Sequence, residues 1–341
     1  MTELSPSPEP VQAEKPRRSW MPWVVALYAL SMVAAVLVLW RGASRPTQDG
    51  AKPEALRAAK GMLSAVGEKD AVGVVSISGA IYRSDGGGLW PRGLSQWERR
   101  LERFGKRKDI KAVVLSIDSP GGSVGSVQEL NSRILRMRRE LKKPVVAQLG
   151  DVAASGGYYL AASCDKIVSQ PGTLLGSIGV IFRHSNIEGL LGKVGVRSEA
   201  IKSGKLKDIG SMSRPMTKEE RELLQGLIDN AYGQFVKAVA QGRGMPEETL
   251  RPLADGRIFT GEQALALGLV DQLGDFEDAV TLAGRLGGIR GRPRVVRDVE
   301  GLSDMLEMLD SRWEASVLPE PALFRALGRA AYSGLEYRWN L

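Results

Sequence analysis

Cysteine and histidine are almost missing from this chain of 341 residues, which contains one of each, Cys164 and His184. A single cysteine excludes an intrachain disulfide bond and a cysteine-based metal cluster. A single histidine excludes a zinc site built from two or three histidines. A conventional serine or cysteine catalytic triad would have to use His184, because such a triad needs an imidazole base.

The overall composition carries no strong bias. Hydrophobic residues make up 43% and charged residues 25% of the chain, which is typical of a globular protein and excludes wholesale disorder or a collagen-like repeat. The length allows one large domain or two domains of about 150 residues each. The net charge of +8 is compatible with an anionic partner, but it is only a weak indication of one. No aromatic interleaving or known nucleic-acid module accompanies the basic residues, so we expect no nucleic-acid partner.

A long uncharged stretch lies near the beginning of the sequence. Residues 1–19 are rich in proline, serine and charged residues, which predicts a disordered tail. Residues 20–40 follow, with no charged residue from Met21 to Trp40. Twenty helical residues rise about 30 Å, which matches the hydrocarbon core of a bilayer. We predict a transmembrane anchor that contacts lipid, because the apolar core of a cleaved signal peptide is shorter, about 7–15 residues.

The charges flanking this stretch leave the orientation of the anchor open. Equal numbers of basic residues lie on the two sides, so the positive-inside rule gives no preference. These residues are Lys15, Arg17 and Arg18 before the stretch, and Arg41, Arg45 and Lys52 after it.

The rest of the sequence divides into three predicted parts. Residues 41–70 indicate a stalk, residues 71–290 the main domain, and residues 291–341 a helical extension of unknown role. In the main domain, short apolar runs alternate with helical patterns, which predicts parallel βαβ units and an α/β fold. The expected strands are 72–78, 112–118 and 144–149, and the expected helices are 94–104, 125–141, 216–241, 302–309 and 322–331. Thr217 and Glu220 have the spacing of a capping box at the start of the long helix.

A first glycine-rich corner follows the second expected strand, at residues 118–123 (DSPGGS). Paired glycines let backbone N–H groups turn toward a ligand, and the helix that follows adds the positive end of its dipole. The corner lacks the Gly-Lys-Ser/Thr of a P-loop and the spacing of a dinucleotide fingerprint. A phosphate cradle, an oxyanion hole and a purely structural turn all remain open from the residues alone.

A second corner, residues 150–159 (GDVAASGGYY), follows the third expected strand. Ser155 lies where a helix would begin, between small residues that leave space for a substrate carbonyl. The N–H of Gly156 would be placed to bind the oxyanion that an attack by Ser155 creates. The alternative is that Ser155 only caps the helix.

A nucleophilic serine needs a base, and the sequence offers two kinds. His184 is the only histidine, without an obvious aspartate partner. A lysine serves when burial lowers its pKa, and serine–lysine pairs are a known variant of the triad. The lysine-rich stretch 202–209 (KSGKLKDI) is the candidate, and spacing alone does not distinguish Lys202, Lys205 and Lys207.

Several motifs, in order along the chain, resemble those of the signal peptide peptidase A family of membrane-anchored serine–lysine proteases, in its short, one-repeat form. The similarity extends over about residues 72–280. Its motifs are SPGGSV at 119–124, GDVAASGGYY at 150–159, GSIGV at 176–180, KSGKLKDI at 202–209, GRGM at 242–245 and ADGRIFTG at 254–261.

This resemblance implies a role for individual residues. Ser155 matches the nucleophile, Lys207 the general base and Ser177 a serine that hydrogen-bonds the catalytic lysine. Gly122 and Gly156 match the backbone donors of the oxyanion hole. Cys164, by contrast, is predicted to be a packed small residue rather than a second nucleophile.

The resemblance also implies an architecture and a function. The family fold is similar to that of Clp protease and crotonase, with repeated ββα units, a mostly parallel sheet and assembly into homo-oligomers. The implied enzyme is a serine endopeptidase of the cytoplasmic (inner) membrane that degrades released signal peptides and other short hydrophobic peptides. Its catalytic domain lies on the extracytoplasmic side, and it needs no metal or nucleotide cofactor.

Two rival functions share this fold. A crotonase-like enzyme would act on acyl-CoA, but it would leave Lys207 and the anchor unexplained. An inactive membrane scaffold would not need the intact set of Ser155, Ser177 and Lys207. The sequence therefore favours the peptidase.

Overall fold

The computed structural model describes residues 69–83, 93–297 and 336–339. The predicted tail and anchor, and the helices expected at 302–309 and 322–331, lie outside these ranges. Within them, no helix combines the length and the apolar character needed to cross a bilayer.

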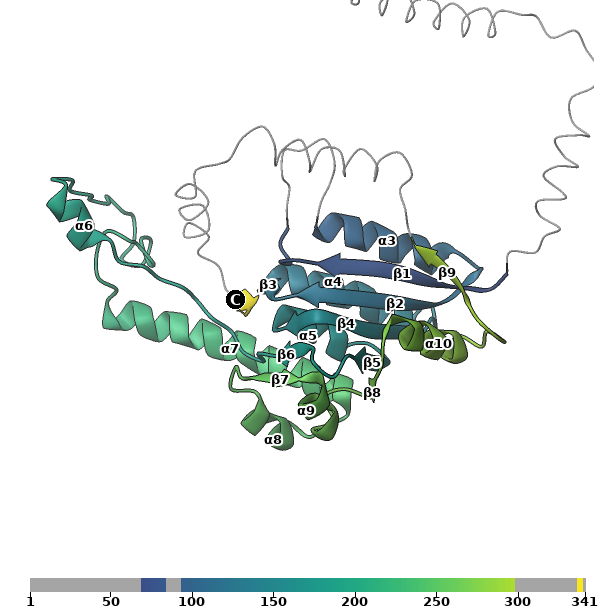
Figure 1. The fold of residues 1–341 in the computed structure, drawn as a ribbon. Helices are drawn as coiled ribbons and strands as arrows, with labels where there is room; N and C mark the ends of the chain where they lie inside the picture. The colour runs from purple at the N-terminus through teal and green to yellow at the C-terminus, as the bar shows by residue number, and fades with distance from the viewer. Residues whose placement is uncertain (1–68, 84–92, 298–335, 340–341) are drawn as a thin grey trace, which may run out of the picture. The chain divides into compact units, whose positions relative to one another are not determined.

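A mostly parallel β-sheet forms the centre of the fold (Figure 1). Its main path runs β7-β6-β4-β2-β1-β9, and β5 and β8 extend it from β4. The strands are β1 Ala71–Ser78, β2 Ile110–Ser119, β4 Val145–Ala154, β5 Lys166–Ser169, β6 Leu174–Gly176, β7 Ile258–Thr260, β8 Gln272–Leu273 and β9 Arg294–Arg297. All pairs in this sheet are parallel except β6 with β7. The predicted α/β class with a mostly parallel sheet is confirmed.

Helices cover both faces of the sheet. One face packs against α3 (Leu94–Lys106), α4 (Val124–Arg139) and α5 (Gly156–Ala162), which share a large apolar core with β1, β2 and β4. The other face packs against α10 (Phe276–Leu286) through a smaller core. Because both faces are buried, the central strands are nearly continuous apolar runs.

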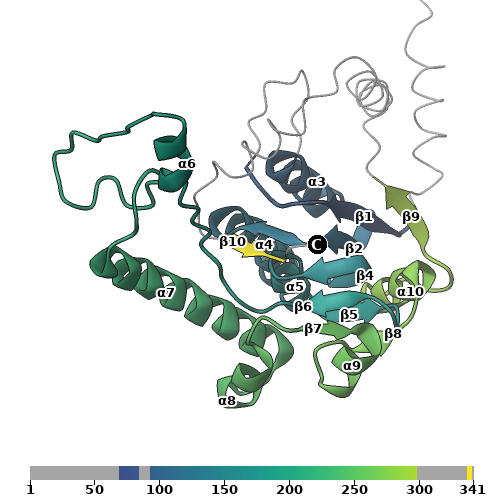
Figure 2. The same cartoon turned by 60° about the vertical axis from the view of Figure 1, so that its left-hand side comes forward.

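The long helix α7 (Lys218–Arg243) begins with the predicted capping box. Thr217 accepts a hydrogen bond from the N–H of Glu220, and the Glu220 carboxylate accepts one from the N–H of Thr217. Two short helices follow it, α8 (Glu247–Leu250) and α9 (Gly261–Ala266). The short helix α6 (Glu188–Lys193) and the loops around it project from the rest of the described fold, as two views show (Figures 1 and 2).

The segment expected to be a helical extension contributes strands where it is described. β9 pairs in parallel with β1 at one edge of the sheet. β10 (Glu336–Arg338) pairs antiparallel with β3 (Gly121–Ser123) in a separate two-stranded sheet. Both strands are too short to show an alternating pattern, and their conformation depends on pairing with strands that lie far away in sequence.

Candidate active site

The carboxyl ends of two neighbouring parallel strands place Ser155 and Ser177 together. In the β4–β6 ladder, Ala154 is in register with Gly176, so each serine is the next residue along its own strand. The N–H of Ser155 donates to the carbonyl of Gly176 at 2.8 Å. The edge at which parallel strands end is where α/β folds commonly bind ligands.

Ser155 occupies a strained turn between β4 and α5. Its backbone has φ 52° and ψ −116°, outside the regions that non-glycine residues usually adopt. Its side chain is not a helix cap, because its hydroxyl makes no capping hydrogen bond. The Oγ atom is buried and has no hydrogen-bond partner within the described part of the chain. A strained serine between a strand and a helix is the arrangement that exposes the nucleophile in α/β-hydrolases, although the G-x-S-x-G sequence is absent here.

Glycines bring the first corner close to Ser155. A Cβ atom on Gly157 would lie 2.8 Å from the Ser119 carbonyl oxygen, so only glycine lets α5 approach the end of β2 this closely. A Cβ atom on Gly122 would lie 1.9 Å from the Ile81 carbonyl oxygen. Gly156 is the first residue of α5, where the N–H group has no acceptor within the helix. The structure thus brings Gly122 and Gly156 to the same end of the sheet as the two serines.

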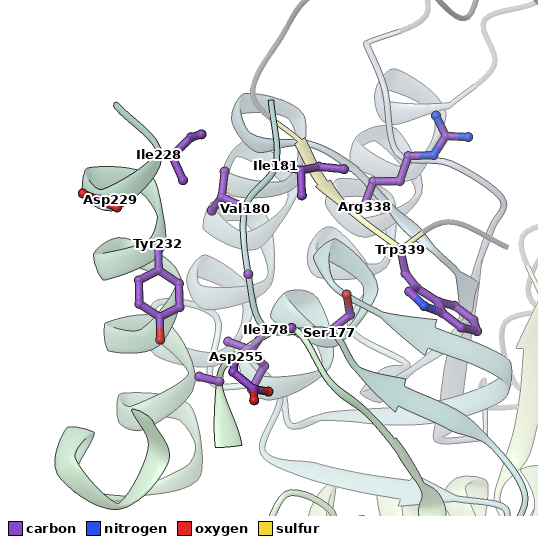
Figure 3. Close-up of a pocket in the computed structure, with 13 residues that line it drawn as sticks. Ser177, Ile178, Val180, Ile181, Ile228, Asp229, Tyr232, Asp255, Arg338 and Trp339 are labelled. Carbon is purple, nitrogen blue, oxygen red and sulfur yellow. The ribbon is translucent and has the colours of Figure 1, made fainter. Parts of the chain in front are cut away.

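Ser177 also has a left-handed backbone, with φ 48°. Its N–H donates to the Arg257 carbonyl at 2.7 Å, which ties the turn after β6 to the loop before β7. Its side chain lines a cavity beside the end of β6 (Figure 3). The other lining residues include Ile178, Val180, Ile228, Tyr232, Arg338 and Trp339.

Lys207 is not brought to the serines. It lies between α6 and α7 with an exposed side chain. Within the described residues, no hydrogen bond or ion pair joins the Lys207 side chain to any partner. The other two lysines of the stretch are paired, Lys202 with Asp208 at 2.6 Å and Lys205 with Glu219. Lys207 is therefore the lysine of this stretch whose amine is free.

A carboxylate network fixes the loop that carries Lys207 to the start of α7. Arg214 hydrogen-bonds both Asp208 and Glu220. Hydrogen bonds from Arg214, followed by those from Thr217, lower the pKa of Glu220 to about 2. Hydrogen bonds from Arg214 and Lys202 lower the pKa of Asp208 well below its usual range. Both carboxylates are charged at neutral pH and hold the loop in place.

Within the described residues, no hydrogen bond joins either of the two remaining sequence candidates, His184 and Cys164, to Ser155. The Nε2 atom of His184 is buried and has no hydrogen-bond partner in the described ranges. Cys164 is buried two residues after the end of α5, and burial raises the pKa of its thiol. The Cys164 thiol donates weakly to the Leu160 carbonyl at 3.5 Å, as expected for a packed residue rather than a nucleophile.

Several residues at this site could not be predicted from the sequence. Arg338 and Trp339 line the cavity from a position about 160 residues beyond Ser177. Tyr232 reaches the cavity from α7. No local motif marks these positions, because only the tertiary fold brings them to the ends of β4 and β6. Within the described residues, no cluster of histidine, cysteine, aspartate and glutamate has the arrangement of a metal site.

The fold and the strained serine define a hydrolase-like α/β domain, and comparison with known proteins identifies its family. The model of "Peptidase family S49" matches residues 137–290. "Putative protease slr0021" of Synechocystis is 50% identical over 184 residues, which cover 54% of this chain and 66% of that relative. "Putative signal peptide peptidase SppA" of Enterococcus faecium is 41% identical over 181 residues, 53% of this chain and 52% of the relative. "Putative protease MJ0651" of Methanocaldococcus jannaschii is 37% identical over 235 residues, 67% of this chain and 74% of the relative.

The chain belongs to peptidase family S49, and the resemblance to the signal peptide peptidase A family is confirmed. The family is one of serine peptidases. The matched region spans less than two thirds of the first two relatives' own length.

Proposed function

We propose that this chain is a serine endopeptidase in which Ser155 is the nucleophile. The observation that carries the proposal is the strained, buried Ser155, whose Oγ has no partner within the described residues. Strain of this kind is retained where it serves a site, because ordinary packing would relax it. Membership of peptidase family S49 agrees with this assignment.

The proposed reaction combines Ser155 and the glycine N–H groups at its end of the sheet with Lys207, the base that the family resemblance implies. The Ser155 Oγ attacks the substrate carbonyl, and the neutral amine of Lys207 accepts the serine proton and later gives it to the leaving amine. The N–H groups of Gly122 and Gly156 stabilise the oxyanion, which is a large part of the rate enhancement in acyl transfer. Ser177 holds the lysine amine by a hydrogen bond. Neither a metal nor a nucleotide is needed for these steps.

Because Lys207 is not brought to Ser155 within its own chain, we propose that a second copy of the chain supplies the lysine. The projecting α6 region exposes several large apolar side chains, which indicates a surface that is covered in an assembly. These are Leu190, Val194, Val196 and Ile201, the last fully exposed. A head-to-tail contact between copies would complete each site with a lysine from its neighbour, and such contacts form a ring when the rotation between copies closes.

The proposed substrates are short hydrophobic peptides, such as released signal peptides. The apolar side chains beside Ser177 suit such peptides. The anchor predicted at residues 20–40 would place the enzyme at the cytoplasmic membrane, with the domain on the extracytoplasmic side. We also propose that the fold is of the Clp protease and crotonase type.

Single variants test the assignment of the nucleophile and the base. Ser155→Ala and Lys207→Ala should both abolish cleavage of a synthetic signal peptide in detergent while keeping the wild-type circular dichroism spectrum. Lys207→Arg should also be inactive, because a guanidinium stays protonated. The matched control is Lys205→Ala in the same stretch, which should cleave at the wild-type rate. Activity in folded Ser155→Ala would contradict the proposal.

A further inference from the structure

A second cavity lies between α4, α7 and the turn that follows α5. Its volume is about 500 Å³, which is within the range of sites that bind small molecules. α5 begins beside Ser155 and ends at Ala162, and the next residue, Ser163, lines the cavity. Neither Ser155 nor Ser177 is among the lining residues, so this cavity is separate from the candidate active site.

Four cationic side chains line this cavity, and we call it the basic cavity. They are Arg138, Arg139, Lys142 and Lys237. The one carboxylate among the described lining residues, Asp165, forms an ion pair with Arg138 at 2.7 Å. In the described part of the chain, no hydrogen bond or ion pair joins the side chains of the other three cations to a partner. Three unpaired positive charges around one cavity repel one another and attract an anion.

The usual preference of helix ends for cations explains only part of this charge. Arg138 and Arg139 end α4, where the helix dipole favours them. Lys237 lies on α7 more than one turn before its end at Arg243, and the dipole effect is confined to the last turn. Lys142 follows α4 with a left-handed backbone, φ 52°, which glycine usually adopts after a helix. A lysine in a conformation that disfavours it points to a use for its side chain.

The lining of the basic cavity also holds buried polar atoms without a partner. Asn131 is 9% exposed, and its Oδ1 atom has no hydrogen-bond partner within the described ranges. The Nε atom of Arg138 is likewise buried and unpartnered there, although the other guanidinium nitrogens bind Ser163 and Asp165. Buried polar atoms without hydrogen bonds cost free energy, so a ligand that supplies those bonds gains affinity. The cavity thus offers one buried acceptor and one buried donor beside three free cations.

We infer that the basic cavity binds a phosphate ester that carries a hydroxyl group, with the chemistry of glycerol phosphate. The phosphate oxygens accept hydrogen bonds from Lys142, Lys237 and the Nε of Arg138. The hydroxyl donates to Asn131 Oδ1, which an anionic oxygen cannot do because it has no proton. Free glycerol phosphate and the head group of phosphatidylglycerol both present these groups. The inference goes beyond the proposed function and does not depend on Ser155.

Isothermal titration calorimetry of the full chain in detergent tests the inference with two probes. These are glycerol phosphate and dihexanoyl phosphatidylglycerol, a water-soluble lipid with the same head group. Tighter binding of the lipid would identify a lipid head group as the ligand, whereas glycerol phosphate binding at least as tightly would identify a free phosphate ester. Dihexanoyl phosphatidylcholine, whose head group has no hydroxyl, controls for uptake into the micelle and should not bind. Failure of both probes to bind would overturn the inference.

Three lysine variants test whether binding takes place in the basic cavity. Lys237→Gln should weaken binding about 10-fold to 100-fold, because a hydrogen bond to a charged group is lost. Lys142→Gly should weaken binding without lowering the Tm, because glycine adopts φ 52° without strain. The matched control is Lys108→Gln, which removes an exposed lysine outside the cavity and should bind as the wild type does. Wild-type affinity in Lys237→Gln, or an equal loss in Lys108→Gln, would overturn the inference.

Discussion

Replacing Gly122 by alanine tests the oxyanion hole through a single methyl group. The added Cβ would lie 1.9, 2.5 and 2.6 Å from the backbone oxygen, carbon and nitrogen of Ile81. Backbone atoms cannot rotate away as a side chain does, so β3 and Ile81 have to separate. The separation weakens two hydrogen bonds of 2.9 Å, from Ile81 N–H to Gly121 and from Ser123 N–H to Ile81.

The size of both effects follows from these contacts. Two hydrogen bonds contribute about 1–3 kcal/mol, and such a loss lowers the Tm of a domain of this size by roughly 3–10 °C. The domain should stay folded, because natural domains are stable by about 5–15 kcal/mol. The displaced Gly122 N–H no longer meets the oxyanion, and losing one such donor lowers kcat about 10²–10³-fold.

Gly125→Ala is the matched control, three residues further along the chain. Gly125 lies in the first turn of α4, and a Cβ atom there would meet nothing within 4 Å. Alanine in place of a helical glycine stabilises by about 0.5–1 kcal/mol, so the Tm should rise slightly and kcat should not change. Thermal melts and steady-state cleavage of a hydrophobic peptide measure both quantities. A folded Gly122→Ala enzyme with wild-type kcat would refute the assignment of this N–H.

Two further variants test the loop that carries Lys207 and the choice of base. Arg214 and Thr217 lower the pKa of Glu220 from its usual 4.5 to about 2, so its charge stabilises the fold above pH 4.5 and loses that effect as the pH falls toward 2. Glu220→Gln should therefore have a lower Tm than wild type at pH 7, and this difference in Tm should shrink as the pH falls from 4.5 to 2. A difference in Tm that does not change with pH would argue against the ion pair. His184→Ala should keep peptidase activity within a few-fold of wild type, and complete loss would make His184 the base.

Local sequence was sufficient to locate Ser155 and Gly156. A buried apolar run followed by small residues and paired glycines predicts a strand, a tight turn and a helix, and the structure has β4, Ser155 and α5 in that order. The capping box at Thr217 is equally local and was also predicted correctly. Such features depend on residues that are neighbours in the sequence.

The features that were not predicted depend on distant parts of the chain. The three residues of β10 form a strand only because β3 and Ile181 offer open backbone groups on either side. The lysine stretch could be found by its motif, but its position relative to Ser155 could not, because the loop between Ser177 and α7 carries no pattern that fixes its direction. The roles of Lys207 and Ser177 therefore remain predictions.

Mixing two inactive variants tests the central claim most directly. Ser155→Ala keeps Lys207, and Lys207→Ala keeps Ser155, so a site shared between copies can be rebuilt from one chain of each kind. After equal amounts are exchanged in detergent, we expect about a quarter of the wild-type peptidase activity, because one interface in four combines both intact residues. Native mass spectrometry would show whether the assemblies contain both variants. If they do and have no peptidase activity, the claim that a neighbouring copy completes the serine peptidase site is contradicted.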